Sequence, residues 1–288
     1  MAVAKRSIKK VGLVVKRERP EAIAIARTLT RFLRTRNKTP VADSETAKKI
    51  GAEAVERHHL ADHADLIVVL GGDGTLLGVA RLVASEGIPI LGVNLGGLGF
   101  LTEVTTAEAQ AALGRVLAGD YEVDRRIMLE AIVDRASEEQ PQSFQAFNDV
   151  VVGKGPLGRM LELDVIANHT PFCSYRADGL IIATPTGSTA YALSAGGPIV
   201  YPTLNAIVLA PICPHTLSNR PVVLPDSYEI EIRVTAPDHD TTFTVDGQES
   251  SQLGPADTIK IHRGRHAVSL IRSAHPYFEI WRDKLHWG

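Results

Sequence analysis

A carboxylate lies inside a glycine-rich loop in the first third of the chain. The loop, Gly71-Gly72-Asp73-Gly74-Thr75, follows the apolar run 66–70, which is typical of a buried strand in a parallel sheet. After Thr75, apolar residues recur at helical spacing as far as Val83, and Gly87 ends the segment. The pattern therefore predicts a strand, a tight loop and a helix whose first N–H groups offer a binding site to an anion.

Asp73 restricts what this loop can bind, because a carboxylate does not contact a phosphate without a cation between them. We predict that Asp73 faces a hydroxyl group or a metal, while the surrounding backbone, formed by Gly71, Gly72, Gly74 and Thr75, holds phosphates. Such a site brings an alcohol and a polyphosphate together, as a small-molecule kinase requires. A plain Gly-Asp turn is the alternative, although the loop lacks the spacing of a dinucleotide fingerprint or of a P-loop.

Composition is that of an ordinary globular protein. The chain has 288 residues, of which 44% are hydrophobic and 22% charged, so it is long enough for two domains. Its 31 basic and 33 acidic residues give a formal charge of −2, which provides no cationic field for nucleic acid or an anionic membrane. The apolar run 11–15 is too short for a signal peptide, and the two cysteines form no C-x-x-C motif. We expect a cytoplasmic protein without nucleic-acid or membrane partners.

Residues 1–126 alternate between strand and helix patterns, as in an α/β domain with a parallel sheet. The sequence predicts strands at 11–15, 66–70 and 88–93, a helix from Pro20, and a helix that begins with a capping box at Thr105 and Glu108. Ligands of such sheets lie beyond the carboxyl ends of the strands. The loops 71–75 and 94–100 both fall there.

From residue 127 onward the pattern changes to alternating strands separated by Gly, Pro, Asn and Asp. Strands are predicted at 128–133, 147–152, 161–167, 179–183, 207–210, 228–234, 241–245 and 258–261. We predict a β-rich domain over 127–268 with one short helix near 189–195. The segment 269–288 has helical spacing, and we expect it to pack back on the first domain.

A cluster of small hydroxyl residues, 184–189, precedes that short helix. Hydroxyl and N–H donors at a helix start suit a ribose or a phosphate, whereas a surface loop rich in Ser and Thr is the alternative. Ser188 is a poor candidate for a hydrolase nucleophile, because Thr186 and Ala190 stand where a nucleophile elbow needs glycine.

Two adjacent polar residues, Asn148 and Asp149, interrupt the apolar strand predicted at 147–152. Neighbours on a strand point to opposite faces, so at least one of them has a buried partner or a ligand; a turn at the strand end is the alternative. His59 and His63 have the spacing of a helical metal pair, but no third ligand accompanies them. We predict a solvated helix end there and no protein metal site.

Six motifs, taken in their order along the chain, resemble the bacterial type of the NAD kinase family and cover nearly its whole length. They occupy 71–75, 92–101, 148–149, 178–198, 211–221 and 245–248. The first is shared with the diacylglycerol kinase and phosphofructokinase relatives, whereas the block 184–198 is specific. The resemblance implies an NAD kinase-like fold with an α/β N-terminal domain and a β-rich C-terminal domain.

The same resemblance implies the reaction and its participants. The γ-phosphoryl group of ATP is transferred to the adenosine-ribose 2′-hydroxyl of NAD, giving NADP. A divalent cation, expected to be Mg²⁺, is carried with ATP, and the chain is expected to form a homo-oligomer, a dimer or a tetramer.

Residue roles follow from the resemblance position by position. Asp73 is implied as the proton acceptor, with Gly74 beside the same substrate. The implied NAD-binding residues are Asn148 and Asp149 at ribose or adenine, Arg176 and Asp178 near nicotinamide, Thr189, Ala190, Tyr191 and Ser194 around adenosine, and also Arg159 and Gln248. Asp149 departs from the Asn-Glu pair common in the family, which shortens its reach by one methylene.

Arg176 and Asp178 are two residues apart, so on an extended strand their side chains share a face and can form an ion pair. Alternatively, Arg176 binds the pyrophosphate or a ribose. Two other functions stay open from the residues alone. A lipid kinase of the same superfamily would need an acyl-chain groove, which the donor-rich block around Ser188 disfavours; a non-catalytic NAD(P) sensor would have no need of Asp73.

Overall fold

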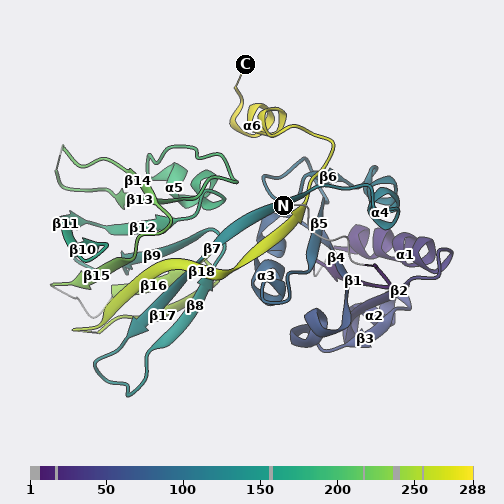
Figure 1. The fold of residues 1–288 in the computed structure, drawn as a ribbon, viewed down its shortest axis with the longest axis horizontal. Coiled ribbons are helices and arrows are strands. Elements are labelled where there is room, and N and C mark those ends of the chain that lie inside the picture. Colours follow the sequence, from purple (N-terminus) through teal and green to yellow (C-terminus); the bar gives the residue numbers. More distant parts are fainter. Residues whose placement is uncertain are drawn as a thin grey trace. The chain divides into compact units, whose positions relative to one another are not determined.

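The computed structural model describes residues 7–16, 19–155, 158–216, 218–235, 241–254 and 256–287. Leu217 of the 211–221 motif lies outside the described residues. The chain divides into two compact units, residues 1–125 with 268–288 (unit 1) and residues 126–267 (unit 2). Two long strands, β7 (Val123–Asp134) and β18 (Thr258–Ile271), include the points where the chain passes between the units (Figure 1).

Unit 1 is built on a parallel sheet with the strand order β3-β2-β1-β4-β5 and the end of β18 beside β5. Its strands are β1 (Lys10–Val15), β2 (Thr39–Asp43), β3 (Glu53–Val55), β4 (Leu66–Gly71), β5 (Pro89–Asn94) and the short β6 (Val104–Thr105). Strand β4 is buried along its whole length because it pairs with β1 and β5 and is covered on both faces. The predicted strands at 11–15, 66–70 and 88–93 are confirmed.

Unit 1 also contains helices. They are α1 (Pro20–Arg34), α2 (Ser44–Ile50), α3 (Asp73–Val83), α4 (Ala109–Leu117), α6 (Tyr277–Leu285) and the 3₁₀ helix η1 (Arg57–His63). Helix α3 begins at Asp73, three residues before Leu76, where the predicted helical spacing starts, because Gly72 in an extended conformation serves as its N-cap. The Thr105 N–H and hydroxyl both donate to Glu108 Oε2, at 3.0 and 2.6 Å. The predicted capping box is nevertheless wrong, because α4 begins at Ala109 with Glu108 as its N-cap and the Thr105 hydroxyl caps no helix N–H.

Sequence patterns did not indicate the β2-α2-β3 segment, residues 39–55. Strand β2 contains Pro40 and ends at Asp43, so its apolar run is only two residues long. Asp43 nevertheless caps α2 by accepting the Thr46 N–H at 3.1 Å.

Unit 2 contains a six-stranded antiparallel sheet with the order β14-β13-β12-β9-β16-β17. The strands are β9 (Asp149–Lys154), β12 (Gly179–Ala183), β13 (Ala206–Ile212), β14 (Val222–Pro225), β16 (Thr241–Val245) and β17 (Glu249–Gln252). Its other strands are β8 (Gln142–Ala146), which pairs with β7, and β10 (Leu161–Ala167), β11 (Thr170–Ala177) and β15 (Ile230–Val234), which continue from β18. One apolar cluster, which includes Val150, Leu163, Ile182 and Ile259, contains residues from both the six-stranded sheet and the strands that continue from β18, so these two layers pack face to face.

The eight strands predicted in this region are confirmed, three with the predicted bounds (β10, β12 and β16) and five with shifted ends, and the described residues form four more. The additional strands β8, β11, β14 and β17 are largely exposed, so they carry little apolar alternation. The predicted short helix is divided into the 3₁₀ turn η2 (Gly187–Thr189) and α5 (Tyr191–Ser194). Within the described ranges, no helix combines the length and apolar composition needed to cross a bilayer.

Candidate active site

Asp73, the first residue of α3, binds the loop that follows β5. Its Oδ2 accepts the N–H of Phe100 at 2.9 Å. Its Oδ1 accepts the N–H groups of Leu101 and Thr102 at 3.2 and 3.0 Å, and the Thr102 hydroxyl at 2.8 Å. The carboxylate is half-buried and makes no capping bond to its own helix. Four donors therefore hold it in one orientation.

A second layer supports this arrangement. Asn94, at the end of β5, donates from Nδ2 to Thr102 Oγ1 at 2.6 Å and accepts the Gly96 N–H on Oδ1 at 2.9 Å. A Cβ on Gly99 would collide with Asp73 Oδ1 and would lie 2.5 Å from Thr102 Oγ1. Only glycine fits at position 99, because the carboxylate and the hydroxyl already fill that space.

The residues predicted to hold phosphates fall into two groups. Gly71 and Thr75 pack against each other inside the turn, since a Cβ on Gly71 would lie 2.6 Å from Thr75 Oγ1. The Gly71 carbonyl also accepts the Leu95 N–H at 3.0 Å, so these two residues are not open to a phosphate. A Cβ on Gly72 or Gly74, in contrast, would meet no atom within 4 Å. The open side of the loop is thus at Gly72 and Gly74, where a ligand can approach the start of α3.

In unit 2, Asp246 binds the loop that contains Asn148. Its carboxylate accepts three successive N–H groups, from Phe147 at 3.0 Å, Asn148 at 2.7 Å and Asp149 at 3.1 Å. Asp246 and Gly247 both have positive φ, 51° and 62°, and form the turn between β16 and β17. Sequence reasoning did not assign Asp246 a role, although Asp-Gly between strand patterns is a strong hairpin signal.

This binding corrects the prediction that Asn148 and Asp149 lie inside a strand. Strand β9 begins at Asp149, and Phe147 and Asn148 precede it, because their N–H groups bind Asp246 instead of a neighbouring strand. The side-chain Oδ1 of Asn148 is buried and has no hydrogen-bond partner among the described residues. It is an acceptor available to a ligand.

Asp149 is 5% exposed and lies close to Asp246. Burial, and secondarily the charge of Asp246, raises the pKa of the Asp149 carboxyl to about 7 from its usual 3.8. At neutral pH a substantial part of the Asp149 population is therefore protonated and can donate a hydrogen bond as well as accept one.

The hydroxyl cluster 184–189 packs directly on this loop. Thr184 donates from Oγ1 to the Phe147 carbonyl at 2.7 Å, and a Cβ on Gly187 would collide with the Asn148 carbonyl. Ser188 is fully buried, donating to the Pro185 carbonyl at 2.6 Å and accepting the Val200 N–H at 3.0 Å. The prediction that these hydroxyls face a ligand is therefore wrong for Thr184 and Ser188, which hold the loop itself together.

The remaining predicted residues of unit 2 are more open. Thr189 and Ala190 are half-buried, whereas Arg159, Tyr191, Ser194 and Gln248 are exposed. Of the two alternatives for Arg176, the ion pair with Asp178 is not formed. Arg176 pairs with Glu162 at 3.2 Å, its cross-strand neighbour on β10, and Asp178, beyond the end of β11, pairs with Lys154 at 2.8 Å.

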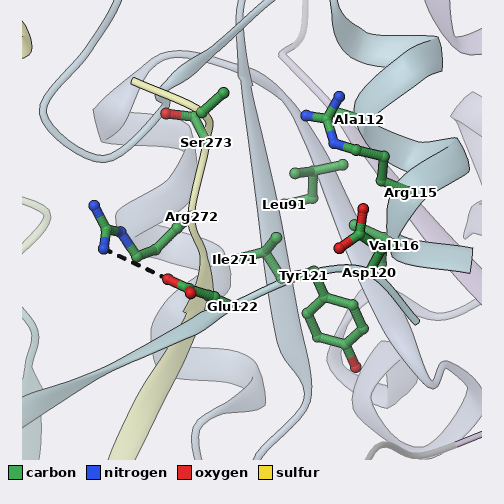
Figure 2. A pocket seen from close by; sticks show the side chains of 11 residues that line it. Leu91, Ala112, Arg115, Val116, Asp120, Tyr121, Glu122, Ile271, Arg272 and Ser273 are labelled. Carbon is green, nitrogen blue, oxygen red and sulfur yellow. Dashed lines mark ion pairs between the residues drawn. The ribbon is translucent and has the colours of Figure 1, made fainter. Parts of the chain in front are cut away.

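A cavity of about 390 Å³ lies elsewhere in unit 1, between the C-terminal part of α4, the segment 120–122 and the end of β18 (Figure 2). Arg272 and Glu122 face each other there at 3.7 Å, and Arg115 extends from α4. None of the predicted site residues lines this cavity. The candidate functional groups thus lie in two loops, the Asp73 loop of unit 1 and the Asn148 loop of unit 2.

A fixed carboxylate in a glycine loop at a helix start is the kind of site that a phosphotransferase acting on an alcohol requires. The chain matches the family models of the ATP-NAD kinase N-terminal domain over residues 11–121 and of the ATP-NAD kinase C-terminal domain over residues 147–273. It belongs to the NAD kinase family, and its reaction is the ATP-dependent phosphorylation of NAD.

Proteins similar to this one align with nearly its whole length. An NAD kinase from Geobacter metallireducens is 45% identical over 282 residues, which cover 98% of this chain and 99% of the relative. One from Thiobacillus denitrificans is 43% identical over 282 residues, covering 96% and 97%. Yeast NADH kinase complexed with NADH has a TM-score of 0.90 at 26% identity, covering 98% of this chain and 88% of that one. An Archaeoglobus fulgidus NAD kinase in complex with ATP shares the fold, with a TM-score of 0.77 at 23% identity over 97% and 100%.

Proposed function

We propose that Asp73 is the group that receives the adenosine-ribose 2′-hydroxyl of NAD and accepts its proton as the γ-phosphoryl group of ATP is transferred. The observation that carries the proposal is the fixed orientation of the Asp73 carboxylate beside an open glycine loop. A carboxylate is a weak base toward a sugar hydroxyl. In a loose phosphoryl-transfer transition state the nucleophile loses its proton late, so orienting the hydroxyl is the larger part of what Asp73 does.

Phosphates are assigned to the open side of the same loop. Gly72 and Gly74 leave room for close approach to the backbone, and the positive end of α3 favours negative charge there. Gly71 and Thr75 support this loop through their packing against each other. The ribose and adenine of NAD are assigned to Asn148 and Asp149: Asn148 Oδ1 accepts a hydrogen bond, and protonated Asp149 donates one.

The other NAD contacts are assigned to Thr189, Ala190, Tyr191 and Ser194 around adenosine, to Arg176 and Asp178 near nicotinamide, and to Arg159 and Gln248. Exposure of Tyr191, Ser194, Arg176 and Gln248 is compatible with ligand binding. Arg176 pairs with Glu162 at the surface, where such a pair is weak and gives way readily to a phosphate.

The divalent cation, proposed to be Mg²⁺, is assigned to the nucleotide. Among the described residues, no group of three or more His, Cys, Asp or Glu side chains is placed to form a cage. This is compatible with Mg²⁺, which usually keeps several waters and binds through substrate phosphates with one or two carboxylates. When bound, the cation neutralises charge on the transferred phosphoryl group. A homo-oligomeric assembly stays a prediction from the resemblance.

The test is to incubate the purified protein with NAD, ATP and Mg²⁺ and to assay NADP enzymatically, for the wild type and for Asp73→Asn. We expect turnover to require Asp73 while NAD binding, measured by calorimetry without ATP, persists in the variant. Near-normal turnover in a folded Asp73→Asn protein would remove the assigned role.

A further inference from the structure

We propose that Thr102 is a positioning residue for Asp73, and that Oδ2 of Asp73 is the oxygen that receives the acceptor hydroxyl. The proposal rests on the role of Asp73 proposed above. It concerns the hydrogen bonds that distinguish the two carboxylate oxygens, and all of them lie within unit 1.

The two oxygens of Asp73 are unequally occupied. A carboxylate offers about four lone-pair sites in all, about two on each oxygen. Oδ1 accepts three donors, the Leu101 N–H, the Thr102 N–H and the Thr102 hydroxyl. Within the described parts of the chain, Oδ2 accepts only the Phe100 N–H, at 2.9 Å. Oδ1 thus has more donors than its about two lone pairs, whereas Oδ2 uses one of its about two, so the acceptor position that remains is on Oδ2.

The direction of the Thr102 hydroxyl bond is determined by its neighbours. The Asn94 amide must present Oδ1 to the Gly96 N–H, so its Nδ2 donates to Thr102 Oγ1, at 2.6 Å. The single hydroxyl proton of Thr102 is then left for Asp73 Oδ1, at 2.8 Å. Because Thr102 is fully buried, water does not compete for either bond.

This hydroxyl prevents rotation of the carboxylate. The backbone donors at positions 100–102 hold the carboxylate in place, but without the hydroxyl Oδ1 and Oδ2 would differ less in occupancy and could exchange places. Misplacing a reacting group by about 1 Å costs about a hundredfold in rate. Gly99 contributes by leaving room, since its missing Cβ would lie 2.5 Å from Thr102 Oγ1 and 2.9 Å from Asn94 Nδ2.

The experiment compares Thr102→Val, which replaces the hydroxyl by a methyl group of similar size, with Thr102→Ser, which retains the hydroxyl. For Thr102→Val we expect kcat to fall by about tenfold to a hundredfold, the range given by a misplaced reacting group, with the KM for NAD changed less than about twofold. Thr102→Ser should recover most of the lost kcat. A purely structural role for Thr102 would lower stability without this split between kcat and KM.

The matched control is Thr30→Val. Thr30 is also a buried threonine of unit 1, 1% exposed in α1, but its hydroxyl has no hydrogen-bond partner among the described residues. Unchanged kcat is expected there. If Thr102→Val turns over like Thr30→Val, the proposal is overturned. Should Thr102→Val not fold, Asn94→Ala provides the same readout, since it removes the amide that directs the hydroxyl; we expect a kcat loss of about threefold to tenfold, and unchanged kcat would overturn the proposal.

A double variant separates this proposal from the proposed function. If Thr102 acts through Asp73, then Asp73→Asn with Thr102→Val should be no slower than Asp73→Asn alone, whereas independent effects would multiply. If Asp73→Asn is inactive and Thr102→Val is fully active, the role of Thr102 is rejected and that of Asp73 is retained. A crystal structure with NAD completes the test: the 2′-oxygen should lie within hydrogen-bond distance of Oδ2, and contact with Oδ1 would reject the assignment.

Discussion

Both units of this protein use a carboxylate to bind three successive backbone N–H groups of a loop. Asp73 binds residues 100–102 in unit 1, and Asp246 binds residues 147–149 in unit 2. In each case a glycine lies where a Cβ would collide, Gly99 with the Asp73 carboxylate and Gly187 with the loop at Asn148. The backbone geometry is thus stabilised in the same way twice.

The two carboxylates differ in exposure and in what lies beside them. Asp73 is half-buried at a helix start and keeps one acceptor position on Oδ2. Asp246 is 8% exposed in a hairpin turn, and its neighbour is a second carboxyl, Asp149. With the role proposed for Asp73, the same hydrogen-bonding arrangement would serve chemistry where the carboxylate reaches solvent and positioning where it is buried.

The largest expected effect is on Asp73. Asp73→Asn should lower turnover by at least about a hundredfold, the low end for loss of a positioned acid–base group, while NAD still binds. Asp65→Asn is the matched control, because Asp65 also accepts two backbone N–H groups in unit 1, from Lys9 and Lys10, both at 2.8 Å. Steady-state kinetics should show a loss only for Asp73→Asn; equal losses would mean that both carboxylates are only structural.

Asp246→Asn tests the other half of the comparison. Losing charge-assisted hydrogen bonds to the loop 147–149 should destabilise the protein by about 2–3 kcal/mol and raise the KM for NAD by about tenfold, with kcat less affected. Thermal unfolding and kinetics on the same preparation measure both. The control is Asp257→Asn in unit 2, where a 6% exposed carboxylate accepts the Ala136 and Gly254 N–H groups. We expect Asp257→Asn to lose stability while its KM for NAD stays at the wild-type value. If Asp246→Asn also has the wild-type KM for NAD, Asp246 does not position the NAD-binding loop.

Asp149 should make stability depend on pH. The pKa of Asp149 is about 7 when folded against 3.8 when unfolded, so the folded state holds a proton that the unfolded state releases between these values. The free energy of unfolding should therefore fall by a few kcal/mol as pH rises from about 4 to about 7. Asp149→Asn has no carboxyl to titrate, so its free energy of unfolding should not fall in this way. Urea denaturation should therefore show that the free energy of unfolding of the variant rises relative to that of the wild type from pH 5 to pH 8. Parallel pH dependences would contradict the assignment.

The same residue also separates ligand binding from structure. If Asp149 exchanges hydrogen bonds with NAD, Asp149→Ala should raise the KM for NAD and leave folding largely intact. Melting temperature and NAD affinity, measured on one preparation, decide the point. A large loss of stability with unchanged NAD affinity would make Asp149 a structural partner of Asp246.

The smallest effect is expected at the exposed edge of unit 2. Arg176→Ala should weaken NAD and NADH about equally, severalfold, if Arg176 reaches a phosphate or a ribose. Glu162→Ala is the control, because it removes the ion-pair partner of Arg176 and leaves the guanidinium. Dissociation constants for both cofactors measure the effect, and a change confined to one oxidation state would place Arg176 beside the nicotinamide ring instead.

Much of the fold could be predicted from the sequence, because local patterns carry it. Strand β4, the glycine loop and the helix after it follow from an uninterrupted apolar run, a glycine pair and helical spacing. The edge strand β17 was not predicted, since none of its side chains is buried. Edge strand β11 was not predicted either, because its side chains alternate between core and solvent only over its last four residues. The donor-rich block 184–189 was recognised, but the hydroxyls of Thr184 and Ser188 proved to be internal.

By itself, then, the sequence determined the family, the reaction and the identity of the carboxylate in the glycine loop, since these rest on residue types in a fixed order. Only the tertiary structure decided what each carboxylate binds. Asp73 and Thr102 are 29 positions apart, and Asp246 and Phe147 are 99 apart. No periodicity within a segment predicts a hydrogen bond over such a separation, because it forms only when the packing of whole strands brings the two loops together.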